Sequence, residues 1–256
     1  MEIDVWFAPV ARNSTILKSE PFVDKPKSKQ TEEYYQDYFC QQLSLVTKVF
    51  KKEARNWNSI NDSRKKSIDS VSIYSTQDHI VLDGWKPDVT IIPMGAPLTQ
   101  MHVLSIGEIK PPKTTGFSND AKGEVLTFAL RILKVQPNRS EVTCFLTDTQ
   151  LIKFFRATRV IRHTSKVNVW KGVGMETVHY EESKTYSLLG KSEGVRLLLQ
   201  LIATAAKSYI PPNIPQFPDH IVLDRWLGRG ATSNVFCGLR NSTQVFYFFK
   251  TYFKFF

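Results

Sequence analysis

Hydrophobic residues recur at three- and four-residue steps between Thr31 and Asn56, with polar residues between them. This spacing is typical of an amphipathic helix that buries one face. We therefore expect one long helix in this part of the chain. The residues expected on its buried face are Tyr35, Phe39, Leu43, Val46 and Phe50.

From about residue 71 the pattern shortens to the two-residue alternation of β-strands, and Gly84, Pro93, Gly95 and Pro97 interrupt it. Four apolar segments follow one another: VSIYS, HIVLDGW, WKPDVTII and MHVLSIGEIK. In a strand, alternate residues face the same side, so each segment can direct one row of side chains into a core.

A second helix is expected after residue 117, with either Ser118 or Asn119 as its N-cap residue. The segment from Val142 to Thr158 then predicts a hairpin, and Asp148 and Thr149 lie near its turn. The apolar stripe of the second helix consists of Val125, Leu126, Ala129, Leu130 and Leu133.

Further strand and loop are indicated for residues 160–187, and a third helix begins near residue 193. Four prolines then fall within residues 209–219. Prolines at this density end helices and form stiff linkers. We therefore expect a domain of residues 1–207, a linker of residues 208–219 and a C-terminal segment of residues 220–256.

The chain is basic, with 34 Lys and Arg residues against 24 Asp and Glu residues and a formal net charge of +10. A basic surface favours phosphate-rich partners, nucleic acid first and an anionic membrane surface second. No run of 18 apolar residues is present, so no transmembrane helix is expected. The first residues lack the pattern of a secretory signal, which favours the nucleus or the cytoplasm.

The three cysteines form no CxxC pair, and no two of the five histidines stand four residues apart. Neither a disulfide framework nor a histidine-rich zinc site is therefore indicated. The cysteines are Cys40, Cys144 and Cys237.

Two short motifs carry candidate chemistry: Pro87-Asp88 at the start of one expected strand and Glu108-Ile109-Lys110 at the end of another. Glu108 and Lys110 face the same side of a strand, and a neighbouring strand could bring Asp88 beside them. Mg²⁺ and Mn²⁺ prefer carboxylate, water and phosphate oxygens. We expect Asp88 and Glu108 to be metal ligands, with the Ile109 carbonyl as a further candidate. Lys110 would position water or neutralise charge on a phosphate.

A structural interpretation of the same residues stays open. Asp88 could cap a turn after Pro87, and Glu108 and Lys110 could form an exposed pair on the sheet. This alternative predicts no metal affinity.

The two motifs resemble those of the PD-(D/E)xK, or restriction-endonuclease-like, superfamily. The resemblance implies an α/β (α+β) fold with a core of helix, three-stranded meander, helix and strand, which matches the order expected for residues 31–147. It also implies metal-dependent hydrolysis of phosphodiester bonds, with DNA as the expected partner. Many members add a glutamate from the first helix, and Glu32 is the candidate here. Others use a polar residue of the second helix, for which Lys122 and Glu124 are weaker candidates.

The segment LGRGATSNV at residues 227–235 resembles the glycine-rich loop of protein kinases. In that family the loop approaches the phosphates of ATP through its backbone. The matching positions here are Gly228, Gly230, Ser233 (in place of the third glycine) and Val235. Neither an HRD-type catalytic loop nor a DFG motif follows, so kinase activity and ATP binding are not expected. We interpret residues 220–256 as the opening β-hairpin of a truncated kinase N-lobe.

A restriction-endonuclease-like domain followed by a kinase domain resembles the Crinkler-type proteins of fungi and oomycetes. The segments that carry this resemblance are KPDVT, GEIK, residues 123–159 and LGRGATSNVF. It implies an effector-like DNA nuclease that can be delivered to a host nucleus, although the family's N-terminal header is not visible in residues 1–30. The alternatives are a catalytically inactive module that binds DNA or protein, and a fragment of a fungal protein kinase.

Overall fold

The computed structural model shows three α-helices and two β-sheets among the residues that it describes. The described residues are 22, 30–56, 71–82, 84–136, 139–162, 175–190, 192–208, 221–229, 233–240 and 243–250. The helices are α1 (Glu32–Asn56), α3 (Asn119–Val135) and α4 (Glu193–Ser208), with a short 3₁₀ helix η3 (Gln100–His102). None of these helices is long and apolar enough to cross a membrane.

Seven of the described strands form one mixed sheet in the order β1-β2-β3-β4-β5-β6, with β7 paired to β5. Its strands are β1 (Val71–Ser75), β2 (Val89–Pro93), β3 (Ser105–Ile109), β4 (Glu141–Thr147), β5 (Leu151–Arg162), β6 (Met175–Glu182) and β7 (Tyr186–Ser187). Only β3 and β4 run parallel; every other pair is antiparallel. A parallel pair needs a crossover connection, and α3 supplies it.

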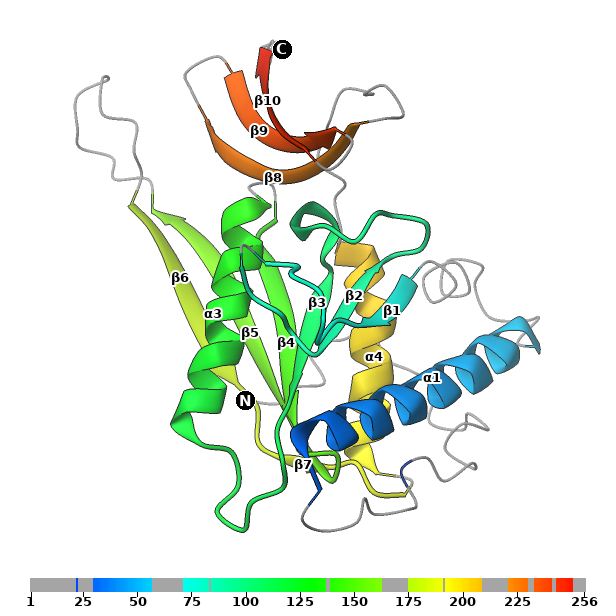
Figure 1. Ribbon diagram of the computed structural model, residues 1–256. Helices are drawn as coiled ribbons and strands as arrows, with labels where there is room; N and C mark the ends of the chain where they lie inside the picture. Colours follow the sequence, from blue (N-terminus) through cyan, green and yellow to red (C-terminus); the bar gives the residue numbers. More distant parts are fainter. Residues whose placement is uncertain are drawn as a thin grey trace.

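The sheet is covered on both faces, which gives a three-layered α/β architecture (Figure 1). The α3 helix buries Val125, Phe128 and Ile132 against one face, whereas α1 and α4 pack against the other face around Phe39 and Leu198. The mixed α/β class is therefore confirmed. The chain order α1, β1, β2, β3, α3, β4 also matches the order expected for the first helix, the antiparallel meander, the second helix and the next strand.

Several local predictions are confirmed. The long first helix begins at Glu32, and the hairpin of β4 and β5 turns at Asp148 and Thr149. Thr149 adopts a positive φ of 74°, and Asp148 Oδ1 accepts hydrogen bonds from the Gln150 and Leu151 amides at 3.0 and 2.7 Å. Ser118 is the N-cap residue of α3, because its hydroxyl accepts a hydrogen bond from the Ala121 amide at 3.3 Å. Leu130, expected on the buried stripe of this helix, is instead exposed.

The apolar segment HIVLDGW was expected to behave like the neighbouring strands, and this expectation is wrong. It forms only an isolated bridge between Leu82 and Trp85, around Gly84 with a φ of 90°. Its apolar side chains have another role: Leu82 is buried in the core beneath α3, and the Trp85 ring meets the Phe128 ring edge-on at 5.8 Å.

The C-terminal segment contains three strands rather than the two of the expected hairpin: β8 (Ile221–Arg229), β9 (Ser233–Arg240) and β10 (Thr243–Lys250). They form a separate antiparallel sheet, in which Gly228 pairs with Val235 and Ser233 opens β9. Gly230 lies outside the described residues, as do residues 209–219 of the expected linker. Figure 1 shows this sheet at one end of α3.

Gly107 of β3 leaves room for the ring of Phe145 on the neighbouring strand β4, which lies directly over it. A Cβ at position 107 would overlap that ring, and Phe145 is fully buried against Phe39 of α1. The glycine therefore lets the sheet and α1 pack closely beside Glu108.

We expect Gly107→Ala to lower the free energy of unfolding by about 2 kcal/mol, the usual cost of overpacking a core. Phe145→Leu in the same chain should recover part of this loss, because it removes the overlapping ring atoms. Urea denaturation measures both. Gly123→Ala on α3, where a Cβ has nothing within 4 Å, is the control and should cause no loss. Equal stability of Gly107→Ala and this control would contradict the packing argument.

Candidate functional site

Three carboxylates meet where the N-terminus of α1 reaches the ends of β2 and β3. Asp88 directly precedes β2, and the pairing of Val89 with Gly107 places it beside Glu108 of β3. Each of Glu32, Asp88 and Glu108 offers one oxygen, and these oxygens all lie within 4.8 Å of one another. The fold thus brings together the acidic residues of both sequence motifs and the candidate from the first helix.

Asp88 is held from three directions. Its Oδ1 accepts a hydrogen bond from Gln36 Nε2 at 2.6 Å, and its Oδ2 accepts one from the Ile109 amide at 2.7 Å. Its own carbonyl accepts a hydrogen bond from the Thr76 amide at 2.9 Å. Ile109 therefore contributes its N–H to the position of Asp88, whereas the sequence suggested its carbonyl as a metal ligand. Each carboxylate oxygen still has a lone pair for a metal ion.

Lys110 lies among the acidic side chains and contacts three of them. Its Nζ is 2.7 Å from Glu108 Oε1, 3.2 Å from Glu32 Oε1 and 3.2 Å from Glu124 Oε2. Lys110 is also anchored by its backbone amide, which donates to the Thr147 carbonyl at the end of β4 at 2.9 Å. The parallel pair β3 and β4 thus fixes where this ammonium group stands.

The second carboxylate oxygen of Glu108, Oε2, takes no part in this network of hydrogen bonds. Glu108 is only 3% exposed, and its Oε2 has no hydrogen-bond partner among the described residues. A buried acceptor without a partner costs about 1–3 kcal/mol, and more for a charged group. A group that binds this oxygen would remove that cost.

The electrostatics of the cluster are unbalanced, since four carboxylates surround one lysine. Burial raises the pKa of Asp88 to about 7, against the opposing effects of the Ile109 hydrogen bond and of Lys110. Burial together with the neighbouring charge of Asp88 raises the pKa of Glu108 to about 8. The pKa of Lys110 is raised above its usual range, because Glu108 and Glu124 outweigh the opposite effect of burial. The cluster therefore favours additional positive charge.

A divalent cation fits this arrangement. Mg²⁺ and Mn²⁺ are hard ions that bind carboxylate oxygens, and the Glu32, Asp88 and Glu108 oxygens are close enough to share one ion. The unpartnered Oε2 of Glu108 supplies a free ligand atom. The alternative interpretation expected Glu108 and Lys110 to form an exposed pair; the two do form an ion pair, but Glu108 is buried.

An open cavity of about 390 Å³ adjoins the cluster, and Glu32, Lys110 and Glu124 line it. Lys113, in the loop after β3, and Asp148, in the β4–β5 turn, also line it, together with residues between Pro111 and Ala121. The cavity therefore exposes Glu32, Lys110 and Glu124 to solvent, whereas Asp88 and Glu108 lie buried behind them.

Two residues that contact the site were missed or underrated from the sequence. Gln36 lies one turn after Glu32 on α1, a four-residue step that places the two side chains on the same side of a helix. Glu124 contacts Lys110, whereas Lys122, its equal among the weaker candidates, faces Glu182 of β6 at 3.7 Å.

A family model described as "Domain of unknown function (DUF6826)" matches residues 32–139. No curated protein and no solved structure matches the chain. The matched stretch extends from the first residue of α1 to just past α3, so it contains the whole carboxylate cluster together with Lys110.

Gln36→Leu tests whether the hydrogen bond to Asp88 holds a metal ligand in place. We expect a loss of about tenfold in Mn²⁺ affinity by calorimetry, the lower end of the effect of removing a partner behind a ligand. Gln41→Leu, an exposed glutamine on the same helix, is the matched control. An unchanged affinity in Gln36→Leu would show that Asp88 does not depend on this hydrogen bond.

The raised pKa values predict a pH-dependent response to metal. In the folded protein the pKa values of Asp88 and Glu108 are raised to about 7 and about 8 from their ordinary values of 3.8 and 4.5. The folded state therefore binds more protons in this window. The stability that these protons confer is complete below the ordinary pKa values and is lost as the pH rises through the raised ones.

A cation that binds the ionised pair restores the lost stability. Saturating Mg²⁺ should therefore raise the Tm more near pH 8 than near pH 6 in scanning calorimetry. The double variant Asp88→Asn, Glu108→Gln should lose this response. An equal effect of Mg²⁺ on the Tm at both pH values would contradict binding of the cation to ionised Asp88 and Glu108.

Proposed function

We propose that this protein is a Mg²⁺- or Mn²⁺-dependent nuclease that hydrolyses phosphodiester bonds in DNA. The observation that carries the proposal is the meeting of Glu32, Asp88 and Glu108 oxygens within 4.8 Å of one another, with Lys110 in contact. The order of helices and strands around them supports a restriction-endonuclease-like core. The net charge of +10 supports a polyanionic substrate.

The residues of the cluster have separate roles in this chemistry. Asp88, Glu108 and Glu32 would hold the cation, and Gln36 and the Ile109 amide keep Asp88 oriented toward it. When bound, the cation would supply Lewis-acid polarisation of the phosphate and a lowered pKa for a water molecule. Lys110 would donate hydrogen bonds to a phosphate oxygen and offset the charge that develops there.

Lys110 is well placed for this role because its partners can change. In the structure its Nζ contacts three carboxylates, two of which, Glu32 and Glu108, belong to the proposed ligand set. A cation bound to those two glutamates would compete for the same oxygens and free donor capacity on the ammonium group. Glu124, which is outside the ligand set, would then keep Lys110 at the edge of the cavity.

A plasmid-nicking assay with Mg²⁺ or Mn²⁺ tests the proposal. The full chain should convert supercoiled DNA to the open form, and EDTA should stop it. Asp88→Asn and Glu108→Gln should each reduce the rate by about a hundredfold or more, the scale expected when a group that takes part in the chemistry is lost.

Two exposed acids provide matched controls. Glu33→Gln alters the residue next to Glu32 on α1, and Asp78→Asn alters an exposed acid in the loop after β1. Both variants should nick at the parent rate, whereas Glu32→Gln should be slower. Nicking by the double variant Asp88→Asn, Glu108→Gln at the parent rate would refute the proposed function, as would binding of DNA without any metal-dependent nicking.

A further inference from the structure

The ammonium group of Lys110 contacts two of the three carboxylates that are proposed to hold the cation. Its Nζ lies 2.7 Å from Glu108 Oε1 and 3.2 Å from Glu32 Oε1. Its third contact is with Glu124 Oε2 at 3.2 Å. An ammonium group has three N–H donors, so these three carboxylates use its whole donor capacity. Lys110 therefore supplies the positive charge that the acids share in the structure.

A divalent cation and this ammonium group oppose each other at Glu108. The side chain of Glu108 is only 4% exposed, so water and salt screen charges poorly there. A cation that takes Oε1 removes a hydrogen bond of Lys110, and a cation that takes the unpartnered Oε2 stands on the same carboxylate as the ammonium group. Like charges repel strongly at such short range. Lys110 therefore lowers the affinity for the cation as long as it stays on Glu108.

Glu124 offers the ammonium group another position. It lies on α3, outside the group of clustered oxygens that could share a metal ion. Glu124 and Lys110 both line the open cavity, and their side chains are 31% and 27% exposed. The backbone amide of Lys110 is held by the Thr147 carbonyl, whereas its four-carbon side chain is flexible. A turn of this side chain toward Glu124 would clear Glu108 without moving the sheet.

We propose that Lys110 is an internal competitor of the divalent cation, and that Glu124 receives its ammonium group when the cation binds. This role rests on the proposed metal site and regulates it. The same lysine lowers the affinity for the cation and, once it is on Glu124, remains at the cavity for the phosphate of a substrate. Glu124 is then a positioning residue, which raises the affinity for the cation without being a ligand.

Two other roles of these residues predict different outcomes. If Lys110 is a fixed counter-ion that holds the acids together, its removal leaves buried carboxylates unbalanced and weakens cation binding. If Glu124 attracts the cation directly, its removal weakens binding whether or not Lys110 is present. The contacts favour competition, because one ammonium group already touches both the ligand acids and an acceptor outside the ligand set.

Titration calorimetry of the full chain with Mg²⁺ tests the competition. It is done at about pH 9, above the pKa values of about 7 and about 8 of Asp88 and Glu108, so that protons do not compete with the cation. Lys110→Met should bind Mg²⁺ about tenfold more tightly, within the usual range of coupling between two binding events. Lys110→Gln, which can still donate to Glu108, should change the affinity in the same direction and gives the same test if Lys110→Met unfolds. An Mg²⁺ affinity of these variants equal to or below that of the parent would overturn the proposal.

A double-mutant cycle tests the part played by Glu124. In the parent, Glu124→Gln removes the alternative partner of Lys110 and should weaken Mg²⁺ binding about tenfold, the lower end of the effect of removing a partner behind a ligand. In the Lys110→Met background no ammonium group has to move, so the same substitution should leave the affinity unchanged. An equal weakening in both backgrounds, or none in either, would overturn the proposal.

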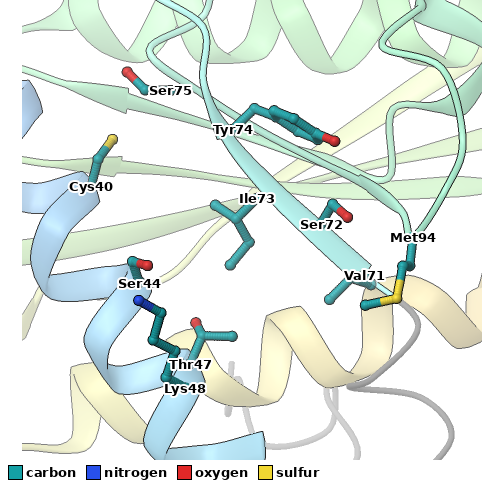
Figure 2. Close-up of a pocket in the computed structure, with 10 residues that line it drawn as sticks. All are labelled: Cys40, Ser44, Thr47, Lys48, Val71, Ser72, Ile73, Tyr74, Ser75 and Met94. Carbon is teal, nitrogen blue, oxygen red and sulfur yellow. The ribbon is translucent and has the colours of Figure 1, made fainter.

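Three exposed charges provide matched controls, and all three variants should bind Mg²⁺ as the parent does. Asp120→Asn and Lys113→Met each remove a charge that lines the same cavity. Lys48→Met removes a lysine of α1 in a separate cavity of about 450 Å³ between α1 and β1 (Figure 2), which shares no lining residue with the cavity beside the cluster. A gain in Lys113→Met as large as that in Lys110→Met would show a general effect of charge and would contradict competition at Glu108. Unfolding midpoints measured without Mg²⁺ confirm that each variant folds.

The plasmid assay separates failure of the competition from failure of the proposed function. Metal-dependent nicking by the parent, with no gain of Mg²⁺ affinity in the Lys110 variants, would refute only the competition. Tighter Mg²⁺ binding by Lys110→Met, without nicking by the parent, would support the competition and refute the nuclease.

Discussion

Two buried carboxylates held side by side are the constraint on which the site depends. Asp88 and Glu108 are 4% and 3% exposed, and both share their surroundings with Glu32 and Glu124. Lys110 offsets part of this charge through contacts with three of the four acids. Clustering like charges at low exposure is unfavourable without compensation. A protein keeps such an arrangement where a cation or a reaction uses it, which links the geometry to the proposed chemistry.

Strand pairing and the first turn of α1 bring the acidic side chains and Lys110 together. The antiparallel register of β2 and β3 sets Asp88 beside Glu108, and the parallel partner β4 anchors Lys110 through the Thr147 carbonyl. The first turn of α1 brings Glu32 to the same place, where the positive end of the helix dipole favours an acidic side chain. The same helix then continues along β1 and contacts β3, so it is held against the sheet beside the cluster.

Much of this arrangement follows from the sequence, because it depends on short-range patterns. Strand alternation places Glu108 and Lys110 on one side, and helical phase selects Glu32 over Glu33. Gln36 and Glu124 could not be chosen with the same certainty, since a polar residue on a helix acquires a partner only once the helix is placed against the sheet. The segment HIVLDGW does not form a strand for a related reason. Leu82 is apolar because it is buried beneath α3, and burial alone does not specify a strand.

The central claim is that Glu32, Asp88 and Glu108 share one divalent cation. A crystal of the protein soaked in Mn²⁺ and measured for anomalous scattering tests it most directly. The account predicts one strong anomalous peak in contact with the Asp88 and Glu108 carboxylates, at about the 2.0–2.6 Å typical of hard cations and oxygen ligands, with Glu32 as the third protein ligand. A map without a peak there at saturating Mn²⁺, with Lys110 still bound to Glu108, would contradict it.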